Sequence, residues 1–240
     1  MKFIGDYHTH TTYSDGKGSV WENANAAREK GLREVAVTDH GFHIPSMNFR
    51  KYLESKDRCK EAEDALGIRV ISGLEANVIS LDGEVDVKES ELSSIDYLTV
   101  GFHKFALCKG IGDFFKMYAV TYFNGLVKTS ERAVERNTRA LIAAIERYPV
   151  KVLTHVNHSL KVDVAAVAAA CAKRGVLVEL NVKHLKDLKG HWDALRESEA
   201  SFIVNSDAHR PSEVGELSAA FEAAVRAGIS KDRIVNYCGE

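Results

Sequence analysis

The chain has 240 residues, of which 45% are hydrophobic and 28% are charged, and its formal net charge is −2. This is the composition of one globular domain with a sizeable core, and it excludes a broadly basic surface for long nucleic acids or membranes. No apolar run approaches the roughly 20 residues of a membrane-spanning helix, and the N-terminus does not read as a secretory signal. We therefore expect a cytoplasmic protein with no membrane partner.

Seven short runs rich in Val, Ile, Leu or Phe are predicted as β-strands. Several of them are apolar at consecutive positions, which is typical of parallel strands covered on both faces. They span residues 3–8, 34–38, 69–74, 97–102, 151–155, 176–181 and 201–205.

Helical patterns occupy most of the gaps between these strands. The first is predicted to begin after Ser19 as N-cap and to end near Gly31. Others cover 134–145 and 162–171, and the last covers 214–225 with Ser212 as its cap. Repeated strand–helix alternation predicts an α/β fold with a parallel sheet, either a closed barrel or an open doubly wound sheet. No glycine-rich phosphate-binding motif follows the first strand, which argues against nucleotide-binding open sheets.

Residues 104–133 interrupt this alternation. The segment is rich in aromatic residues and has a mild basic excess. We predict that it is a long loop or insertion within a single domain spanning residues 1–240. The four cysteines are far apart and form no CxxC pair, which indicates thiols in a reducing compartment.

Histidines and carboxylates recur at the C-terminal ends of the predicted strands. In a parallel β/α barrel these ends converge on one face, so residues far apart in sequence are expected to meet in one cleft. His8 and His10 belong to one extended segment, and their side chains point to the same side because the side-chain period is two. The predicted metal ligands are His8, His10, Asp15, His40, Glu75, His103, His155, Asp207 and His209.

Imidazole and carboxylate ligands together suit zinc, manganese or iron, and the lack of thiolates favours an open catalytic site over a structural one. This many ligands exceeds the needs of one ion, so we expect two or three divalent ions with Glu75 as a bridge. Asp39 is predicted to orient a ligand. Four other histidines are predicted to have surface or supporting roles, although His158 competes with His155 as a ligand. These four are His43, His158, His184 and His191.

The ordered motifs resemble the polymerase and histidinol phosphatase (PHP) superfamily, from Asp6 to about Asn236. The matching motifs are His8-Thr9-His10 with Ser14-Asp15-Gly16, Thr38-Asp39-His40, Gly73-Leu74-Glu75, Gly101-Phe102-His103, Thr154-His155 and Ser206-Asp207-Ala208-His209. The resemblance implies a distorted TIM-like (βα)7 barrel with a trinuclear metal centre. It implies one ion at His8, His10, Glu75 and Asp207, a second at Asp15, His40 and His209, and a third at His103 and His155 with Glu75 bridging.

The segments 75–77 and 82–86 look most similar to the small, single-domain phosphatase-like branch of this superfamily. The chain departs from that branch after the fifth strand, where it reads His155-Val156-Asn157-His158 in place of a frequent His-Pro-Gly. A changed loop beside the third metal is expected to alter substrate fit or metal occupancy.

The expected reaction is hydrolysis of a small phosphomonoester, as in a histidinol phosphatase, by a metal-bound water. Lys104 and Arg210 are candidates for binding the phosphate, and His184 is a candidate proton donor to the leaving group. One alternative is a nuclease or nucleotide phosphatase acting on short oligonucleotides or 3′,5′-bisphosphonucleotides. Another is a metal-binding module without catalysis. The physiological metal and the oligomeric state stay open.

Overall fold

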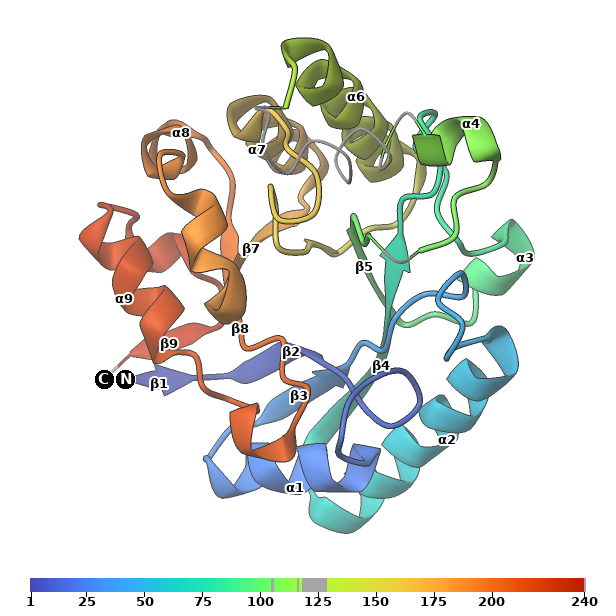
Figure 1. The fold of residues 1–240 in the computed structure, drawn as a ribbon. Coiled ribbons are helices and arrows are strands. Elements are labelled where there is room, and N and C mark those ends of the chain that lie inside the picture. Colours follow the sequence, from blue (N-terminus) through green and yellow to red (C-terminus); the bar gives the residue numbers. More distant parts are fainter. Residues whose placement is uncertain (105, 116, 118–128, 240) are drawn as a thin grey trace.

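Seven parallel strands form the centre of the molecule in the computed structural model, which describes residues 1–104, 106–115, 117 and 129–239 (Figure 1). Each strand pairs with the next one along the chain. The strands are β2 (Gly5–Thr9), β3 (Glu34–Val37), β4 (Arg69–Asn77), β5 (Tyr97–Gly101), β6 (Val152–Leu153), β7 (Leu177–Asn181) and β8 (Phe202–Asn205).

The sheet curls until its two edge strands meet. The backbone nitrogen of His10 donates to the carbonyl of Ala208 at 2.8 Å, and the nitrogen of Ala208 donates to the carbonyl of His8 at 3.2 Å. These bonds join the segment after β8 to the end of β2, which gives a nearly closed barrel. The predicted distorted TIM-like barrel is confirmed.

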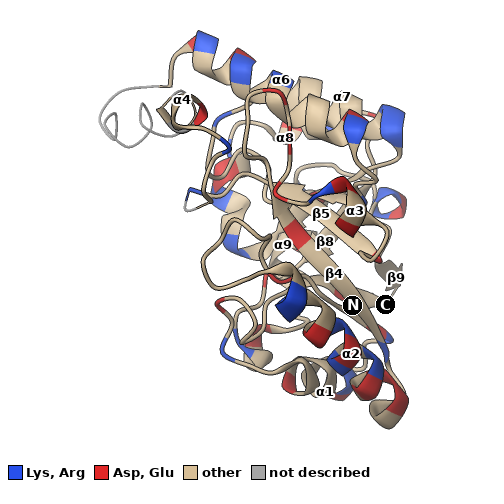
Figure 2. Cartoon of the chain, turned by 90° about the vertical axis from the view of Figure 1, so that its right-hand side faces the viewer, with Lys and Arg blue, Asp and Glu red and all other residues tan. Residues whose placement is uncertain are grey.

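Helices surround the barrel, as Figure 1 shows. Charged side chains lie mainly on these helices and on the loops (Figure 2). The helices are α1 (Val20–Glu29), α2 (Phe49–Leu66), α3 (Glu89–Leu92), α4 (Ile111–Phe114), α6 (Glu131–Arg147), α7 (Val164–Arg174), α8 (Trp192–Glu197) and α9 (Ser218–Arg226), with 3-10 helices η2 (Val182–Leu188), η3 (Pro211–Glu213) and η4 (Lys231–Arg233). No helix in the described part of the chain is long and apolar enough to cross a membrane.

The helix ends test the predicted caps. Ser19 caps α1 and exchanges hydrogen bonds with Glu22, so this prediction is confirmed. The prediction for Ser212 is wrong, because Ser212 lies in η3 and α9 begins only at Ser218. Pro211 starts the 3-10 turn. Gly215 has a φ of 76°, a left-handed conformation that prevents a continuous helix from Ser212 into α9.

Two further elements differ from the prediction. Helix α2 was not predicted, because its buried stripe includes Ser55 and Cys59 among many charged residues. The first predicted strand, 3–8, is two strands, since β1 (Lys2–Phe3) leaves the barrel and pairs with β9 (Tyr237–Gly239). The predicted insertion at 104–133 includes α4 and the start of α6, and its residues 105, 116 and 118–128 lie outside the described residues.

Arg233 fastens the C-terminal segment to the loop between α8 and β8. Its guanidinium donates to the carbonyls of Arg196 at 2.8 Å, Ser198 at 2.7 Å and Ala200 at 2.7 Å. It also lies over the ring of Phe202, 4.9 Å from the centroid. The guanidinium thus supplies a charged donor to three backbone carbonyls between the last turn of α8 and the start of β8.

We expect Arg233→Ala to lower the free energy of unfolding by about 3 kcal/mol, because several carbonyls lose a charged donor. Chemical denaturation measures this value. The control is Arg226→Ala, which removes only an exposed pair with Glu222 and should cost less than about 1 kcal/mol. Equal losses in the two variants would show that the carbonyl contacts contribute nothing specific.

Candidate metal centre

The C-terminal ends of the strands carry a dense group of imidazoles and carboxylates. Strands of this barrel all run in one direction, so their ends bring together side chains that are far apart in sequence. All nine residues predicted as ligands lie here. We call them the principal cluster: His8, His10, Asp15, His40, Glu75, His103, His155, Asp207 and His209.

Glu75, in β4, is fully buried at the centre of the principal cluster. Its Oε1 atom is 2.8 Å from His155 Nε2 and 3.3 Å from both His8 Nε2 and His103 Nε2. Its Oε2 atom is 3.1 Å from His40 Nδ1. One carboxylate thus contacts imidazoles from four parts of the chain, which is the arrangement expected of a bridging ligand.

His10 belongs to two sets of possible metal ligands, one with His8 and Asp207 and one with Asp15, His40 and His209. Its Nε2 atom is 3.0 Å from His8 Nε2 and 3.3 Å from Asp207 Oδ1. Its Nδ1 atom is 3.7 Å from Asp15 Oδ1, and Asp15 Oδ2 is 3.3 Å from His209 Nε2. The family resemblance assigns His10 to one ion. In the structure, its Nε2 atom lies near His8 and Asp207 and its Nδ1 atom lies near Asp15.

The distances in the principal cluster fit metal ligands. Ligand atoms that bind one ion at about 2.1 Å lie roughly 3 to 3.4 Å from one another. Buried polar atoms are nearly always hydrogen-bonded. Within the described residues, however, four buried polar side-chain atoms of the cluster have no hydrogen-bond partner: His10 Nδ1, His40 Nδ1, Glu75 Oε2 and His103 Nδ1. This donor set suits divalent zinc, manganese or iron.

The carboxylates make the principal cluster attractive to positive charge. Burial disfavours a charged His40, but Asp15 and Glu75 raise the pKa of His40 to about 10. Burial lowers the pKa of His103 to about 4 despite its contact with Glu75. Burial favours a neutral Glu75, but the adjacent imidazoles, above all His103, hold the pKa of Glu75 well below its usual range. A neutral His103 beside an ionised carboxylate is the protonation state that binds a metal ion.

Glu179, in β7, supports the cluster and was not predicted from the sequence. It is fully buried, and its Oε1 atom is 2.7 Å from His8 Nδ1. Its Oε2 atom accepts from the backbone nitrogen of His155 at 2.7 Å and from Asn181 Nδ2 at 2.9 Å. A neutral His8 that donates its Nδ1 proton to Glu179 would present an unprotonated Nε2 to a metal ion in the cluster. The sequence carried one signal of this role, a lone carboxylate within an apolar strand.

Glu179→Gln should weaken metal binding about 10- to 100-fold, because the amide no longer orients His8 as the carboxylate does. Competition with a chromophoric chelator measures the affinity. Glu199→Gln, an exposed glutamate before β8, is the control and should leave the affinity unchanged. Equal affinities in both variants would contradict this role for Glu179.

Asp39 also supports the cluster, but through a turn. Its carboxylate accepts from the Thr11 backbone nitrogen at 2.7 Å, from Thr11 Oγ1 at 2.6 Å and from Ser14 Oγ at 2.5 Å. The bonds hold the turn that carries Asp15. The predicted orienting role of Asp39 therefore concerns this turn, and no hydrogen bond joins Asp39 to an imidazole among the described residues.

The other predicted catalytic candidates differ in their distance from the cluster. His184 Nε2 is 3.5 Å from Asp207 Oδ2, so it contacts a predicted ligand. Lys104 and Arg210 follow His103 and His209 in sequence but are exposed, and in the described part of the chain neither forms an ion pair with the cluster. A cation that the sequence did not indicate lies closer: Lys183 Nζ is 3.1 Å from the His209 imidazole.

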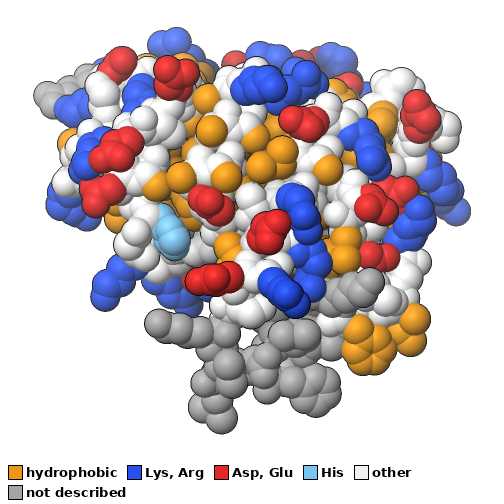
Figure 3. All heavy atoms as spheres, turned by 90° about the horizontal axis from the view of Figure 1, so that it is seen from above, with side chains coloured by type: hydrophobic (Ala, Val, Ile, Leu, Met, Phe, Trp, Pro, Cys, Tyr) orange, Lys and Arg blue, Asp and Glu red, His pale blue; other side chains and the backbone are white. Residues whose placement is uncertain are grey.

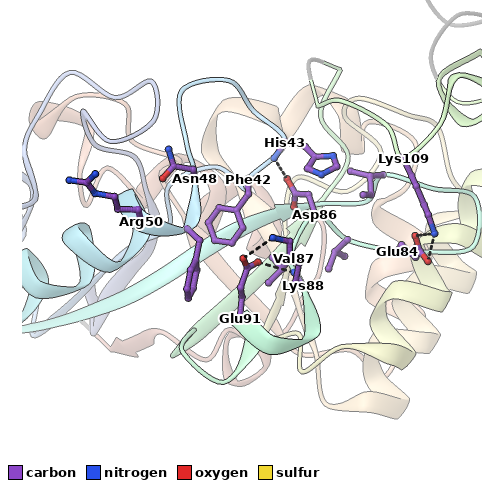
Figure 4. A pocket seen from close by; sticks show the side chains of 13 residues that line it. Phe42, His43, Asn48, Arg50, Glu84, Asp86, Val87, Lys88, Glu91 and Lys109 are labelled. Atoms are coloured by element: carbon purple, nitrogen blue, oxygen red, sulfur yellow. Dashed lines mark hydrogen bonds and ion pairs between the residues drawn. The ribbon is translucent and has the colours of Figure 1, made fainter.

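A pocket of about 640 Å³ lies between the loops that follow β3 and β4 (Figure 4). The Phe42 ring and the His43 imidazole line it, and the buried Asp86 carboxylate accepts from the His43 backbone nitrogen at 2.9 Å. Both loops directly follow cluster residues, His40 and Glu75. The pocket therefore lies at the same end of the barrel as the principal cluster.

Comparison with known families agrees with this geometry. The model of the PHP domain family matches residues 6–225. The chain belongs to the PHP family. The predicted resemblance is thus confirmed over nearly the whole chain.

Relatives of this PHP protein are named phosphatases. It is 27% identical over 246 residues to a "probable phosphatase" of Thermoanaerobacter sp. (strain X514), covering 98% of this chain and 91% of that protein. It is 28% identical over 251 residues to a "probable phosphatase" of Shewanella frigidimarina (strain NCIMB 400), covering 100% and 91%.

A solved structure shares the fold. The histidinol phosphate phosphatase of Lactococcus lactis subsp. lactis Il1403, crystallised with zinc, L-histidinol and phosphate, superposes with a TM-score of 0.59. The two chains are 17% identical, and the match covers 94% of each. At this identity the likeness establishes the barrel architecture alone.

Proposed function

We propose that this PHP protein hydrolyses a small phosphomonoester at the principal cluster. The family match and the named relatives make the chain a hydrolase of the phosphatase type. The observation that carries the finer proposal is Glu75, whose two oxygens contact five imidazoles of the cluster. Two or three divalent ions bound there would supply a Lewis acid and an activated water. A single domain over residues 1–240, with an insertion at 104–133, and a cytoplasmic location belong to the same proposal.

The chain's own residues bind and orient the substrate. The nine residues of the principal cluster would hold the ions. Glu179 orients His8 and the backbone of His155, and Asp39 holds the turn that carries Asp15. Lys183, 3.1 Å from the His209 imidazole and paired with Glu213 at 3.0 Å, is a candidate to bind a phosphate oxygen, and Lys104 and Arg210 are further candidates at the exposed rim. His184, in contact with Asp207, is a candidate to donate a proton to the leaving alkoxide.

The pocket of Figure 4 is proposed to receive the organic part of the ester. Its wall combines the apolar ring of Phe42 with polar groups of His43 and Asp86, which suits a small amphiphilic group. The substrate of the Lactococcus lactis relative, histidinol phosphate, has this size and character. Lys88 and Lys109, also at the pocket, are already paired with Glu91 and Glu84.

Phosphate release from a panel of esters tests the proposal. The panel contains histidinol phosphate, an aryl phosphate and 3′,5′-bisphosphonucleotides, and the protein is loaded with zinc or manganese. We expect metal-dependent release from a small monoester. Release from the nucleotides alone would favour the nucleotide phosphatase alternative. The side of the barrel seen in Figure 3 carries interspersed charges of both signs and no continuous basic track for a longer nucleic acid. No release with any ester or metal would contradict the phosphatase proposal.

A further inference from the structure

A second group of metal-type side chains lies beside the principal cluster and shares no residue with it. His158 is in the loop after β6, and His184 and Asp187 are in η2. One ligand atom from each of the three lies within 4.8 Å of the others. All three are partly buried, so the group is not a chance meeting of freely moving surface side chains. We call it the side group.

Hydrogen bonding accounts for only part of the side group. His158 Nδ1 is 2.7 Å from Asp187 Oδ2, which is a hydrogen bond. His184 Nδ1 is 3.7 Å from the same oxygen, which is too long for one. This nitrogen is buried and has no hydrogen-bond partner within the described residues. The two rings lie only 3.6 Å apart, centroid to centroid, and two protonated rings at this distance would repel each other.

The surrounding backbone holds these three side chains in position. Asn157 has a φ of 67°, a left-handed conformation that turns the chain between His155 and His158. Its side-chain amide donates to the backbone carbonyl of Asp187 at 2.9 Å, which ties the two loops together. Lys161 lies 3.8 Å from Asp187 Oδ1 and leaves Oδ2 facing the two imidazoles. The fold therefore holds the two loops that carry the side group together, and the two rings would move apart slightly to bind one ion.

We propose that His158, His184 and Asp187 bind an additional divalent transition-metal ion, separate from the ions of the principal cluster. Two imidazoles and one carboxylate suit zinc or iron(II), and three protein ligands leave coordination positions open. His184 joins the two sites, because its Nε2 atom is 3.5 Å from Asp207 Oδ2. An ion bound at its Nδ1 atom would exclude the proton-donor role proposed above for His184, so only one of the two roles can hold. A carboxylate that contacts the far nitrogen of a metal-binding imidazole is the usual way to orient such a ligand.

The site lies on the loop where the chain departs from the pattern frequent in the phosphatase-like branch. His158 belongs to the His155-Val156-Asn157-His158 segment. The proposal does not depend on phosphatase activity, since it concerns ion binding alone. Its failure and the failure of the proposed function are therefore seen in different measurements.

Metal counting tests the site directly. Protein stripped by a chelator is reloaded with zinc, desalted and analysed by elemental mass spectrometry. Asp187→Asn should hold one zinc ion fewer per chain than the unaltered protein. The control is Asp193→Asn, the same chemical change at an exposed aspartate in the first turn of α8, and it should leave the zinc count unaltered.

A gain of signal gives a second, independent test. In Asp187→Cys a thiolate replaces the carboxylate, and cobalt(II) bound to it should produce a sulfur-to-metal charge-transfer band that the cobalt-loaded unaltered protein lacks. An unchanged zinc count in Asp187→Asn would overturn the proposal. Loss of every ion from Asp187→Asn would also overturn it, because the side group would then not bind its ion separately from the principal cluster. A folded, cobalt-loaded Asp187→Cys protein without the band would overturn it as well.

Discussion

Glu75→Gln is expected to lower kcat/KM for phosphate release about 1,000-fold, while the barrel stays folded. Glutamine keeps the size of Glu75 but removes the negative charge that five imidazoles contact. Loss of one pre-positioned electrostatic group commonly costs about two to three orders of magnitude in rate. Steady-state kinetics on the best ester of the panel, at saturating metal, measures the effect.

The control for this prediction is Glu197→Gln. Glu197 ends α8, and its side chain is 73% exposed, so the same chemical change far from the cluster should leave kcat/KM unaltered. Circular dichroism of both variants establishes that they fold. Full activity in a folded Glu75→Gln protein would show that the reaction does not take place at the principal cluster.

Removal of the metal ions should abolish activity and destabilise the fold. An ion present at 1,000 times its dissociation constant stabilises a folded protein by about 4 kcal/mol. In a chain of this size, 4 kcal/mol corresponds to a fall in Tm of roughly 8–16 °C. The loss is large because the ionised carboxylates of Glu75 and Asp207 are buried, so water cannot compensate their charge when a bound cation leaves.

Thermal melts with and without a chelator measure this change, and added zinc or manganese should restore both Tm and activity. The Glu75→Gln variant should respond less to the chelator, because it has lost the central ligand. Superimposable melts of chelated and metal-loaded protein would contradict metal binding at the cluster.

Much of the barrel was predictable because its signals are local. Each predicted strand from 34–38 to 201–205 overlaps a strand of the structure, since short apolar runs between helical patterns are readable from neighbouring residues. The cap at Ser19 was readable for the same reason. The cap at Ser212 was not, because Pro211 starts a separate 3-10 turn that ends at Glu213, and the positive φ of Gly215 separates this turn from α9.

The site residues also fall into those that the sequence predicted and those that only the structure identified. The sequence by itself determined which imidazoles and carboxylates stand at strand ends, and parallel strands place such ends on one face. Only the tertiary structure decided that Glu179 orients His8, a contact across 171 positions of sequence, and that His158 meets Asp187. A strand end is a local property of the chain. The contact partner of a side chain depends on how the curled sheet brings distant strands and their loops together. A local sequence pattern contains no information about that arrangement.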